Sequence, residues 1–252
     1  MTNSTTRFSN RVENYIKYRP GYPAEVFEVM TNKCGLNASS VVADIGSGMG
    51  IFTKVLLAKV KQVFAVEPND AMREATEKLL QNESEFVSVN GTSENTTLPD
   101  SSVDFITAAQ AFHWFHVQEC KMEFRRIGKP DAWTVIIWNE RREDSSPFLR
   151  GYEALLQKYG TDYAQVNHTR FDAAAIAIFF APQPFECHKF DNCQLFDYAG
   201  LERRLLSSSY TPDASAPHYE EMLRALKELF DTTQNNGIVS FDYDTTLYYG
   251  QL

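Results

Sequence analysis

The sequence has little cysteine, glycine and proline. Its 252 residues include four cysteines, 12 glycines and 10 prolines, against 43% apolar and 13% aromatic residues. The scattered cysteines, Cys34, Cys120, Cys187 and Cys193, make a disulfide framework unexpected and indicate reduced thiols. Low glycine and proline content with many aromatic residues argues against a disordered chain. We therefore expect one principal globular domain.

Basic charge and long apolar runs are also scarce. The chain has 24 basic and 33 acidic residues, a net charge of -9, and the acids are spread along it. A continuous phosphate-binding stripe is hard to build from this composition, so no nucleic-acid partner is expected. No apolar run approaches the roughly 18 residues of a membrane span, and the opening MTNSTTRFSN is too polar for a signal peptide. We expect a soluble, cytoplasmic monomer or homodimer that does not bind membranes.

Strand-like and helix-like segments alternate through the first 140 residues. Strands are predicted at 41–45, 62–67, 86–89, 103–109 and 133–139, and helices at 23–35, 51–60, 70–80 and 117–127. The last of these helices should be stopped by Gly128 and Pro130. This alternation predicts an α/β fold with a doubly wound, mostly parallel sheet.

The second half of the chain is less regular. Helices are predicted near 147–159, 171–180, 197–207 and 217–233, and strands near 187–196 and at the run IVSFDYDTTLYY, 238–249. No linker rich in proline, glycine or serine divides this half from the first. We therefore expect a single domain over 1–252, with a cofactor-binding core at about 36–140. Residues 1–35 and 141–252 should complete the sheet and form a helical cap.

A glycine-rich turn follows the first strand. Gly46, Gly48 and Gly50 connect the strand to a helix, which lets the backbone approach a ligand closely. Their spacing is G-x-G-x-G, and Ile51 stands where the dinucleotide fingerprint G-x-G-x-x-G has its last glycine. The turn predicts a ligand site but argues against a nicotinamide dinucleotide.

Two acidic residues flank this turn. Asp44 precedes the first glycine by two residues, where it would repel a pyrophosphate and attract a sulfonium or ammonium group. Glu67 ends the next strand, where an acid can accept both hydroxyls of a ribose. An adenosine joined to a positively charged amino-acid arm fits both, and that compound is S-adenosylmethionine.

Several segments resemble class I S-adenosylmethionine-dependent methyltransferases, and within them the type 11 small-molecule group that includes trans-aconitate methyltransferase-like enzymes. ADIGSGMG (43–50) is similar to the family's motif I and AVEPND (65–70) to its second motif. Similarity continues through 89–115 and 123–138. The resemblance implies a Rossmann-like, mostly parallel seven-stranded sheet and S-adenosylmethionine as cofactor.

The resemblance also implies which residues bind the cofactor. The methionine part would be held by Asp44, Gly46, Ser47, Gly48 and Gly50, and the ribose by Glu67. The adenine face would contact Pro68 and Met72, and the adenine edge would contact Ser93 and Glu94. The cofactor would also be lined by Gln110 and Ala111. The chain has no N/D-P-P-Y/F motif, which disfavours methylation of adenine N6 or a glutamine amide. It also has no Pro-Cys pair at a strand end, which excludes the cysteine-adduct route to 5-methylcytosine.

Candidates for acceptor binding lie beside these motifs. In-line methyl transfer depends mainly on positioning, and a carboxylate acceptor, already a nucleophile, needs a cation to hold it. Arg19, in YRPGYP, could clamp that carboxylate, bind the cofactor's own carboxylate, or simply be solvated. Tyr22 could wall the acceptor pocket or pack on the core.

His113 and Trp114 follow the strand at 103–109. They are candidates for acceptor binding, proton removal or stacking, or they pack in the core. Arg19 and His113 are thus the catalytic candidates, and Arg19, Tyr22 and Trp114 the substrate-binding ones. No metal site is expected, because His113, His116 and Cys120 lack a fourth ligand.

The sequence therefore predicts methyl transfer to an oxygen, preferably of a carboxylate, or to a nitrogen of a small molecule. Three alternatives remain open at this point: a methyltransferase acting on tRNA or protein, a sensor that binds S-adenosylmethionine without turning it over, and a nicotinamide dehydrogenase.

Overall fold

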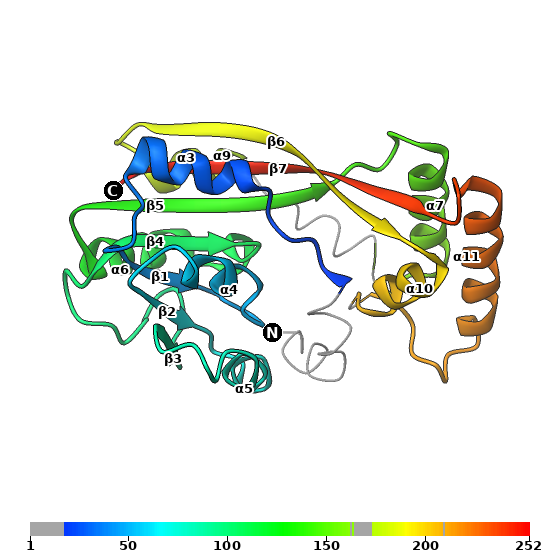
Figure 1. Cartoon of the computed structure of the whole chain (residues 1–252), viewed down its shortest axis with the longest axis horizontal. Helices are drawn as coiled ribbons and strands as arrows, with labels where there is room; N and C mark the ends of the chain where they lie inside the picture. The colour runs from blue at the N-terminus through cyan, green and yellow to red at the C-terminus, as the bar shows by residue number, and fades with distance from the viewer. Residues whose placement is uncertain (1–17, 162, 164–172, 209) are drawn as a thin grey trace. The chain divides into compact units, whose positions relative to one another are not determined.

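The computed structural model describes residues 18–161, 163, 173–208 and 210–252 (Figure 1). Its sheet has seven strands in the order β3-β2-β1-β4-β5-β7-β6. The strands are β1 Val41–Ile45, β2 Gln62–Val66, β3 Phe86–Val89, β4 Val103–Ala109, β5 Gly128–Arg141, β6 Phe185–Phe196 and β7 Val239–Gln251. The helices are α3 Ala24–Cys34, α4 Ile51–Leu57, α5 Asp70–Leu79, α6 Val117–Ile127, α7 Pro147–Tyr159, α9 Ala173–Phe180, α10 Tyr198–Leu206 and α11 Tyr219–Thr233, with a 3-10 turn η1 at Phe112–Trp114.

Strands β1 to β5 form the parallel part of the sheet, which confirms the doubly wound pattern. In the centre, Asp44 of β1 pairs with Ala65 of β2 on one side and with Thr107 of β4 on the other. The carboxyl ends of these three neighbouring strands therefore meet at one edge. In open α/β sheets this edge is where ligands bind.

Strand β7 makes the sheet mixed. The Thr245 hydroxyl donates to Asn139 Oδ1, and Gln251 Nε2 donates to the Asp131 carbonyl. Later residues of β7 therefore lie beside earlier residues of β5, so the two strands run in opposite directions. The same reversal relates β7 to β6, since Tyr243 bonds to Gln194 and Tyr249 to Glu186. The seven strands match the prediction, and β7 runs antiparallel to both of its neighbours.

The junction between α6 and β5 differs from the prediction. Gly128 ends α6 but also begins β5, so the strand starts five residues earlier than the predicted 133 and includes Pro130. Val103 pairs with Gly128 whereas Phe105 pairs with Trp133, so residues 129–132 bulge out of the ladder. Pro130 costs no ladder hydrogen bond there, which is why the strand tolerates it.

The described chain divides into two compact units. Unit 1 comprises Met1–Pro20, Glu140–Arg170 and Asp191–Asp244, and unit 2 comprises Gly21–Asn139, Phe171–Phe190 and Thr245–Leu252, in each case within the described residues. The predicted cofactor-binding core falls almost wholly in unit 2. No helix in the described ranges combines the length and apolarity that a bilayer span requires.

Unit 2 has two apolar layers, one on each face of its strands. Phe105 and Val135 pack with Phe27 of α3 and Phe52 of α4. Their chain neighbours Ile106 and Ile136 point the other way and pack with residues of α6 and α9, such as Phe124 and Phe179. This alternation is what a strand buried on both faces requires. Unit 1 has its own core, in which α7, α11 and β7 contribute Leu149, Tyr152, Leu226 and Phe241.

Candidate functional site

The glycine turn lies where the carboxyl ends of β1, β2 and β4 meet. Gly46 and Gly50 have φ angles of +68° and +74°, in the left-handed region that favours glycine. A Cβ atom at Gly46 would lie 2.6 Å from the Ala111 Cβ, and one at Gly50 would lie 2.6 Å from the Thr76 Cγ2. The turn is therefore held between the end of β4 and α5, with no room for side chains at these two positions.

Asp44 lies at the inner end of this turn. Its side chain is buried, with the residue only 1% exposed. Oδ2 accepts a hydrogen bond from the Thr53 hydroxyl at 2.6 Å, and Oδ1 accepts one from the Thr107 hydroxyl at 2.9 Å. Burial raises the pKa of Asp44 to about 6, although the two hydroxyls act in the opposite direction. The sequence placed this carboxylate beside the turn, and the structure shows it enclosed by two threonines that the sequence did not single out.

Glu67 links the glycine turn to α5. Its Oε2 accepts from the Gly48 N–H at 2.9 Å and its Oε1 from the Asn69 N–H at 2.8 Å. Burial raises the pKa of this carboxyl above its usual value, against the effect of the two backbone donors. Each carboxylate oxygen keeps a second lone pair. Glu67 can therefore shape the turn and still accept ribose hydroxyls, as the sequence predicts.

The start of α5 carries two further predicted cofactor residues. Asn69 caps the helix, with its Oδ1 accepting from the Met72 N–H at 3.0 Å. Pro68 is exposed, whereas Met72 is buried. Thr76, one turn further along, donates to the Gly48 carbonyl at 3.0 Å. The predicted adenine face thus belongs to a segment bonded directly to the glycine turn.

Ser93 and Glu94 lie in the segment between β3 and β4. The Ser93 hydroxyl donates to Glu94 Oε1 at 2.6 Å, and the His116 N–H donates to the same oxygen at 3.0 Å. Burial would raise the pKa of Glu94, but these donors outweigh it and hold the pKa below its usual value. The two predicted adenine-edge residues therefore contact each other and the start of α6.

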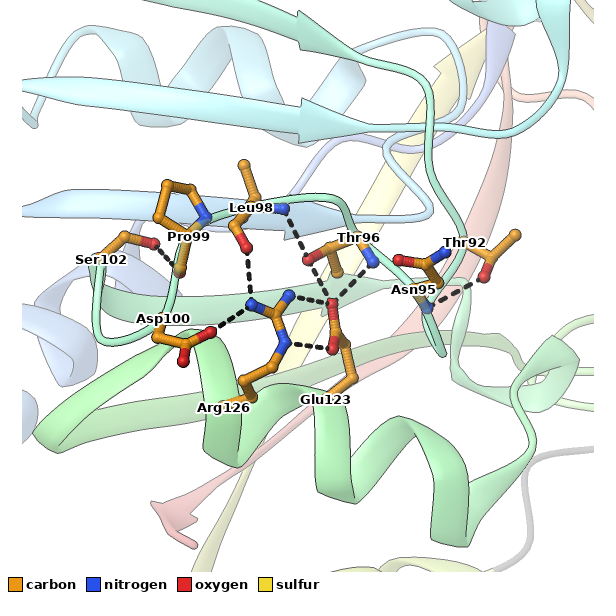
Figure 2. A network of polar contacts seen from close by, with 9 residues as sticks. All are labelled: Thr92, Asn95, Thr96, Leu98, Pro99, Asp100, Ser102, Glu123 and Arg126. Atoms are coloured by element: carbon orange, nitrogen blue, oxygen red, sulfur yellow. Dashed lines mark hydrogen bonds and ion pairs between the residues drawn. The ribbon is translucent and has the colours of Figure 1, made fainter.

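A polar network fixes this segment to α6 (Figure 2). Glu123 accepts from the Thr96 N–H at 2.7 Å and from the Thr96 hydroxyl at 2.6 Å. Arg126 pairs with Glu123 at 2.7 Å and with Asp100 at 2.6 Å, and also donates to the Leu98 carbonyl. Burial would raise the pKa of Glu123, but the bonds from Arg126 and Thr96 hold it below its usual value. No sequence motif marks these residues, because the network forms only once the loop lies against the helix.

We expect Arg126→Ala to lower the free energy of unfolding by about 1–3 kcal/mol, because Glu123 would stay buried without its cation. Arg125→Ala is the matched control, since Arg125 is the exposed neighbour on the same helix. Urea unfolding of the two variants measures the difference. Equal losses would show that the network adds nothing to stability.

The end of β4 presents Gln110 and Ala111. Gln110 has a φ of +59°, which is rare outside glycine, and its Nε2 donates to the Asn139 carbonyl at 2.8 Å. Ala111 is buried against Gly46. Asn139 Nδ2 in turn donates to the Gly21 carbonyl at 3.1 Å, next to Tyr22. The chain before α3 is therefore tied to the ends of β4 and β5.

His113 lies half-buried between two indole rings. Its ring centroid is 4.6 Å from that of Trp114 and 4.9 Å from that of Trp138. Its buried Nδ1 has no hydrogen-bond partner among the residues that the structure describes. Burial lowers the pKa of His113 to about 4, so the imidazole is neutral at neutral pH. Trp114 is 59% exposed, which excludes the interpretation that it fills the core.

The remaining two candidates fall in different units. Tyr22, in unit 2, packs edge-on against Phe52 of α4 with ring centroids 4.8 Å apart. Its predicted role in the acceptor pocket stays a prediction. Arg19 belongs to unit 1, while Asp44 and the glycine turn belong to unit 2. The predicted contact of Arg19 with acceptor or cofactor is therefore also a prediction from sequence.

Comparison with known proteins finds similarity to methyltransferases. Residues 43–136 match the model of a family described as "Methyltransferase domain". An uncharacterized methyltransferase of Schizosaccharomyces pombe, C25B8.09, is 30% identical over 152 residues, which are 60% of this chain and 59% of that protein. The probable S-adenosylmethionine-dependent methyltransferase CRG1 of Saccharomyces cerevisiae is 30% identical over 131 residues, 50% of this chain and 44% of that one. The chain thus spans about half of the length of these relatives.

Solved structures show the same fold at low identity. A protein from Anaeromyxobacter dehalogenans is 20% identical with a TM-score of 0.64, covering 93% of this chain and 98% of its own. The YcgJ protein from Bacillus subtilis is also 20% identical, with a TM-score of 0.57 over 90% of this chain and 98% of its own. These likenesses support the Rossmann-like fold with a mixed seven-stranded sheet.

Proposed function

We propose that this chain, which carries a class I S-adenosylmethionine-dependent methyltransferase domain at 43–136, methylates an oxygen or a nitrogen of a small molecule. S-adenosylmethionine is the methyl donor that this domain and the fold imply. We place the protein in the trans-aconitate methyltransferase-like group on its sequence resemblance. A carboxylate is the acceptor that we prefer.

The observation that carries the proposal is the pair of buried acids around the glycine turn. Asp44, at the end of the strand before the turn, accepts from Thr53 of the helix after it, and Glu67 accepts from the Gly48 N–H of the turn. A buried carboxylate attracts a cation more strongly than an exposed one, because less water screens it. These residues fit a ligand that combines a ribose with a cationic arm. When bound, S-adenosylmethionine supplies an electrophilic methyl group on a sulfonium.

The state of His113 supports an acceptor that needs no proton removed. A pKa of about 4 makes the imidazole a weak base at neutral pH. Its buried Nδ1 and the exposed Trp114 beside it suit orientation and stacking better than proton transfer. A carboxylate, already ionised, requires only to be held in line with the methyl group.

We also propose the partners and the location that the sequence favours. The acidic balance, a net charge of -9, supports a small-molecule acceptor over RNA. The protein would act in the cytoplasm as a monomer or homodimer, without membrane binding.

Transfer of a labelled methyl group from S-adenosylmethionine into pooled metabolites tests this function. We expect a small labelled product that loses its label in alkali, as a methyl ester does. Base-stable label on a small molecule would keep the enzyme and discard the carboxylate. Label in RNA or protein pools would contradict the small-molecule acceptor, and no label from a protein that binds the cofactor would indicate a sensor.

The raised pKa of Asp44 gives a pH dependence of donor binding. Above about pH 6 the carboxylate is charged and attracts the cationic arm, and below it becomes neutral. Affinity for S-adenosylmethionine should therefore fall as the pH drops through 6, by at most about tenfold per pH unit. Calorimetry from pH 5 to 8 measures this. An unchanged slope in Asp44→Asn would assign the dependence to another group.

Replacing Arg19 by alanine should raise the acceptor KM about tenfold or more while changing the donor KM little, if its guanidinium holds an acceptor carboxylate. Arg150→Ala, an exposed arginine of the same unit, is the control. The reverse pattern of KM changes would assign Arg19 to the donor's own carboxylate.

A further inference from the structure

Unit 1 buries two arginines within its aromatic core. Arg204 of α10 is 5% exposed, and the side chain of Arg141 at the end of β5 is 13% exposed. The Arg141 Cζ lies 5.3 Å from the centroid of the Tyr152 ring, and the Arg204 Cζ lies 5.7 Å from that of Phe241. The Tyr152 and Phe241 centroids are 4.8 Å apart. The two guanidinium groups therefore pack on adjoining rings of one cluster.

The cluster has one acid for two cations. Arg141 Nη2 donates to Glu153 Oε2 at 2.5 Å and to the Tyr163 hydroxyl at 3.0 Å. Arg204 Nη1 donates to the Ser208 hydroxyl at 3.2 Å, and Arg204 has no carboxylate within ion-pair distance in the described ranges. One positive charge is thus buried without a negative partner among those residues. Such a charge costs several kcal/mol unless something neutralises it.

Three donors in this cluster lack a partner within the described part of unit 1. Arg141 Nη1, Arg204 Nε and the Tyr152 hydroxyl are buried and have no hydrogen-bond partner among the described residues. Tyr152 is 1% exposed, and burial raises the pKa of its phenol, so the hydroxyl keeps its proton at neutral pH. The Arg204 guanidinium also stays charged, because arginine does not lose its proton in proteins. Native proteins seldom leave buried donors unpaired.

We propose that Arg141, Arg204 and Tyr152 form a binding site for the carboxylate of a small organic acid. One carboxylate supplies the single negative charge that the cluster lacks. Its two oxygens offer four lone pairs, which is enough for the three donors. A phosphate monoester, a dianion at neutral pH, would overcompensate the charge. The site is defined within unit 1 and does not depend on methyl transfer in unit 2.

A hollow in unit 1 borders the same aromatic core, since the ring centroid of its wall residue Phe196 lies 5.6 Å from that of Phe241. It has a volume of about 690 Å³ and is lined in part by Gln194, Phe196 and Arg203. The Tyr243 hydroxyl donates to Gln194 Oε1 at 3.1 Å. Phe196 and Tyr243 thus connect the wall of the hollow to the aromatic core on which Arg204 packs.

Calorimetric titration of the full chain, without S-adenosylmethionine, tests the site. The probes are acetate, benzoate and succinate, each compared with its amide, and inorganic phosphate as a second anion. We expect at least one carboxylate to bind at least about tenfold more tightly than its amide and than phosphate. No binding by any of the three acids at 10 mM, about the weakest affinity that the titration detects, would overturn the proposal. So would equal binding of acid and amide, or tighter binding of phosphate.

Three variants locate the binding. Arg204→Lys should lower the affinity for the carboxylate at least about tenfold, because lysine cannot reproduce the guanidinium geometry. Tyr152→Phe should lower the affinity for the carboxylate about threefold or more. The protein should stay folded, since the lost hydroxyl has no hydrogen-bond partner in the described chain. Arg142→Lys is the control, because Arg142 pairs with Asp244 and Asp191. Unchanged affinity in both test variants would overturn the proposal, and failure of methyl transfer would leave it intact.

Discussion

Asp44→Ala and Glu67→Ala should each weaken S-adenosylmethionine binding by more than about tenfold, or roughly 1.4 kcal/mol. Asp44→Ala removes a buried negative charge that faces two hydroxyls at the end of β1. Glu67→Ala removes the acceptor for ribose hydroxyls and also leaves the Gly48 and Asn69 N–H groups without their bonds. The loss in the second variant should therefore be the larger one.

Calorimetry measures the affinity of the two variants for S-adenosylmethionine, with Glu74→Ala as the control. Glu74 is an exposed acid on α5, so its removal changes the net charge without touching the turn. Unchanged affinity in both Asp44→Ala and Glu67→Ala would contradict the donor site. Glu67→Gln separates the two roles of Glu67, because glutamine keeps one acceptor oxygen for the backbone but loses the charge.

Gly46→Ala should be the most damaging single methyl addition in the donor site. It forces an L side chain into a φ of +68° and places its Cβ 2.6 Å from the Ala111 Cβ. We expect the free energy of unfolding to fall by about 2–4 kcal/mol and donor affinity to fall more than about 100-fold. Either the turn or the Ala111 backbone must move to relieve the contact, and a movement of the turn displaces the backbone that faces the predicted ligand.

Gly237→Ala supplies the matched control for this variant. Gly237 has a φ of +79°, but nothing lies within 4 Å of its added Cβ. Its free energy of unfolding should fall only by the cost of placing an L residue at a positive φ angle, about 1–2 kcal/mol. Chemical unfolding and calorimetry of both variants separate strain from collision. If the free energy of unfolding falls by a similar amount in the two variants, the contact with Ala111 adds no destabilisation of its own.

Much of the parallel core was predictable from the sequence. Apolar segments and helix boundaries located β1, β3 and β4 to the residue, because each is short, apolar and bounded by turn residues. The start of β5 was not predictable. Pro130 normally ends a regular element, and only the bulge at 129–132 lets the strand begin at Gly128.

The positions of Asp44 and Glu67 beside the glycine turn were predictable, but their hydrogen-bond partners were not. Asp44 and Glu67 followed from their places at strand ends, and both prove to be in contact with the glycine turn or the helix after it. Thr107 as a partner of Asp44 depends on the register between β1 and β4, which no single segment encodes. The contacts of Glu123 and Arg126 in Figure 2 were also not predictable from any single segment. Nor were those of the two buried arginines of unit 1, whose surroundings come from distant parts of the chain.

The contact between Gly46 and Ala111 has a consequence for protein engineering. The two positions lie 65 residues apart in sequence, yet their combined side-chain volume is fixed by one narrow gap. A mutational library that varies position 46 should therefore return only glycine for as long as position 111 keeps a Cβ atom. Substitutions meant to change the proposed acceptor are better directed at Trp114, where 59% exposure leaves room for change.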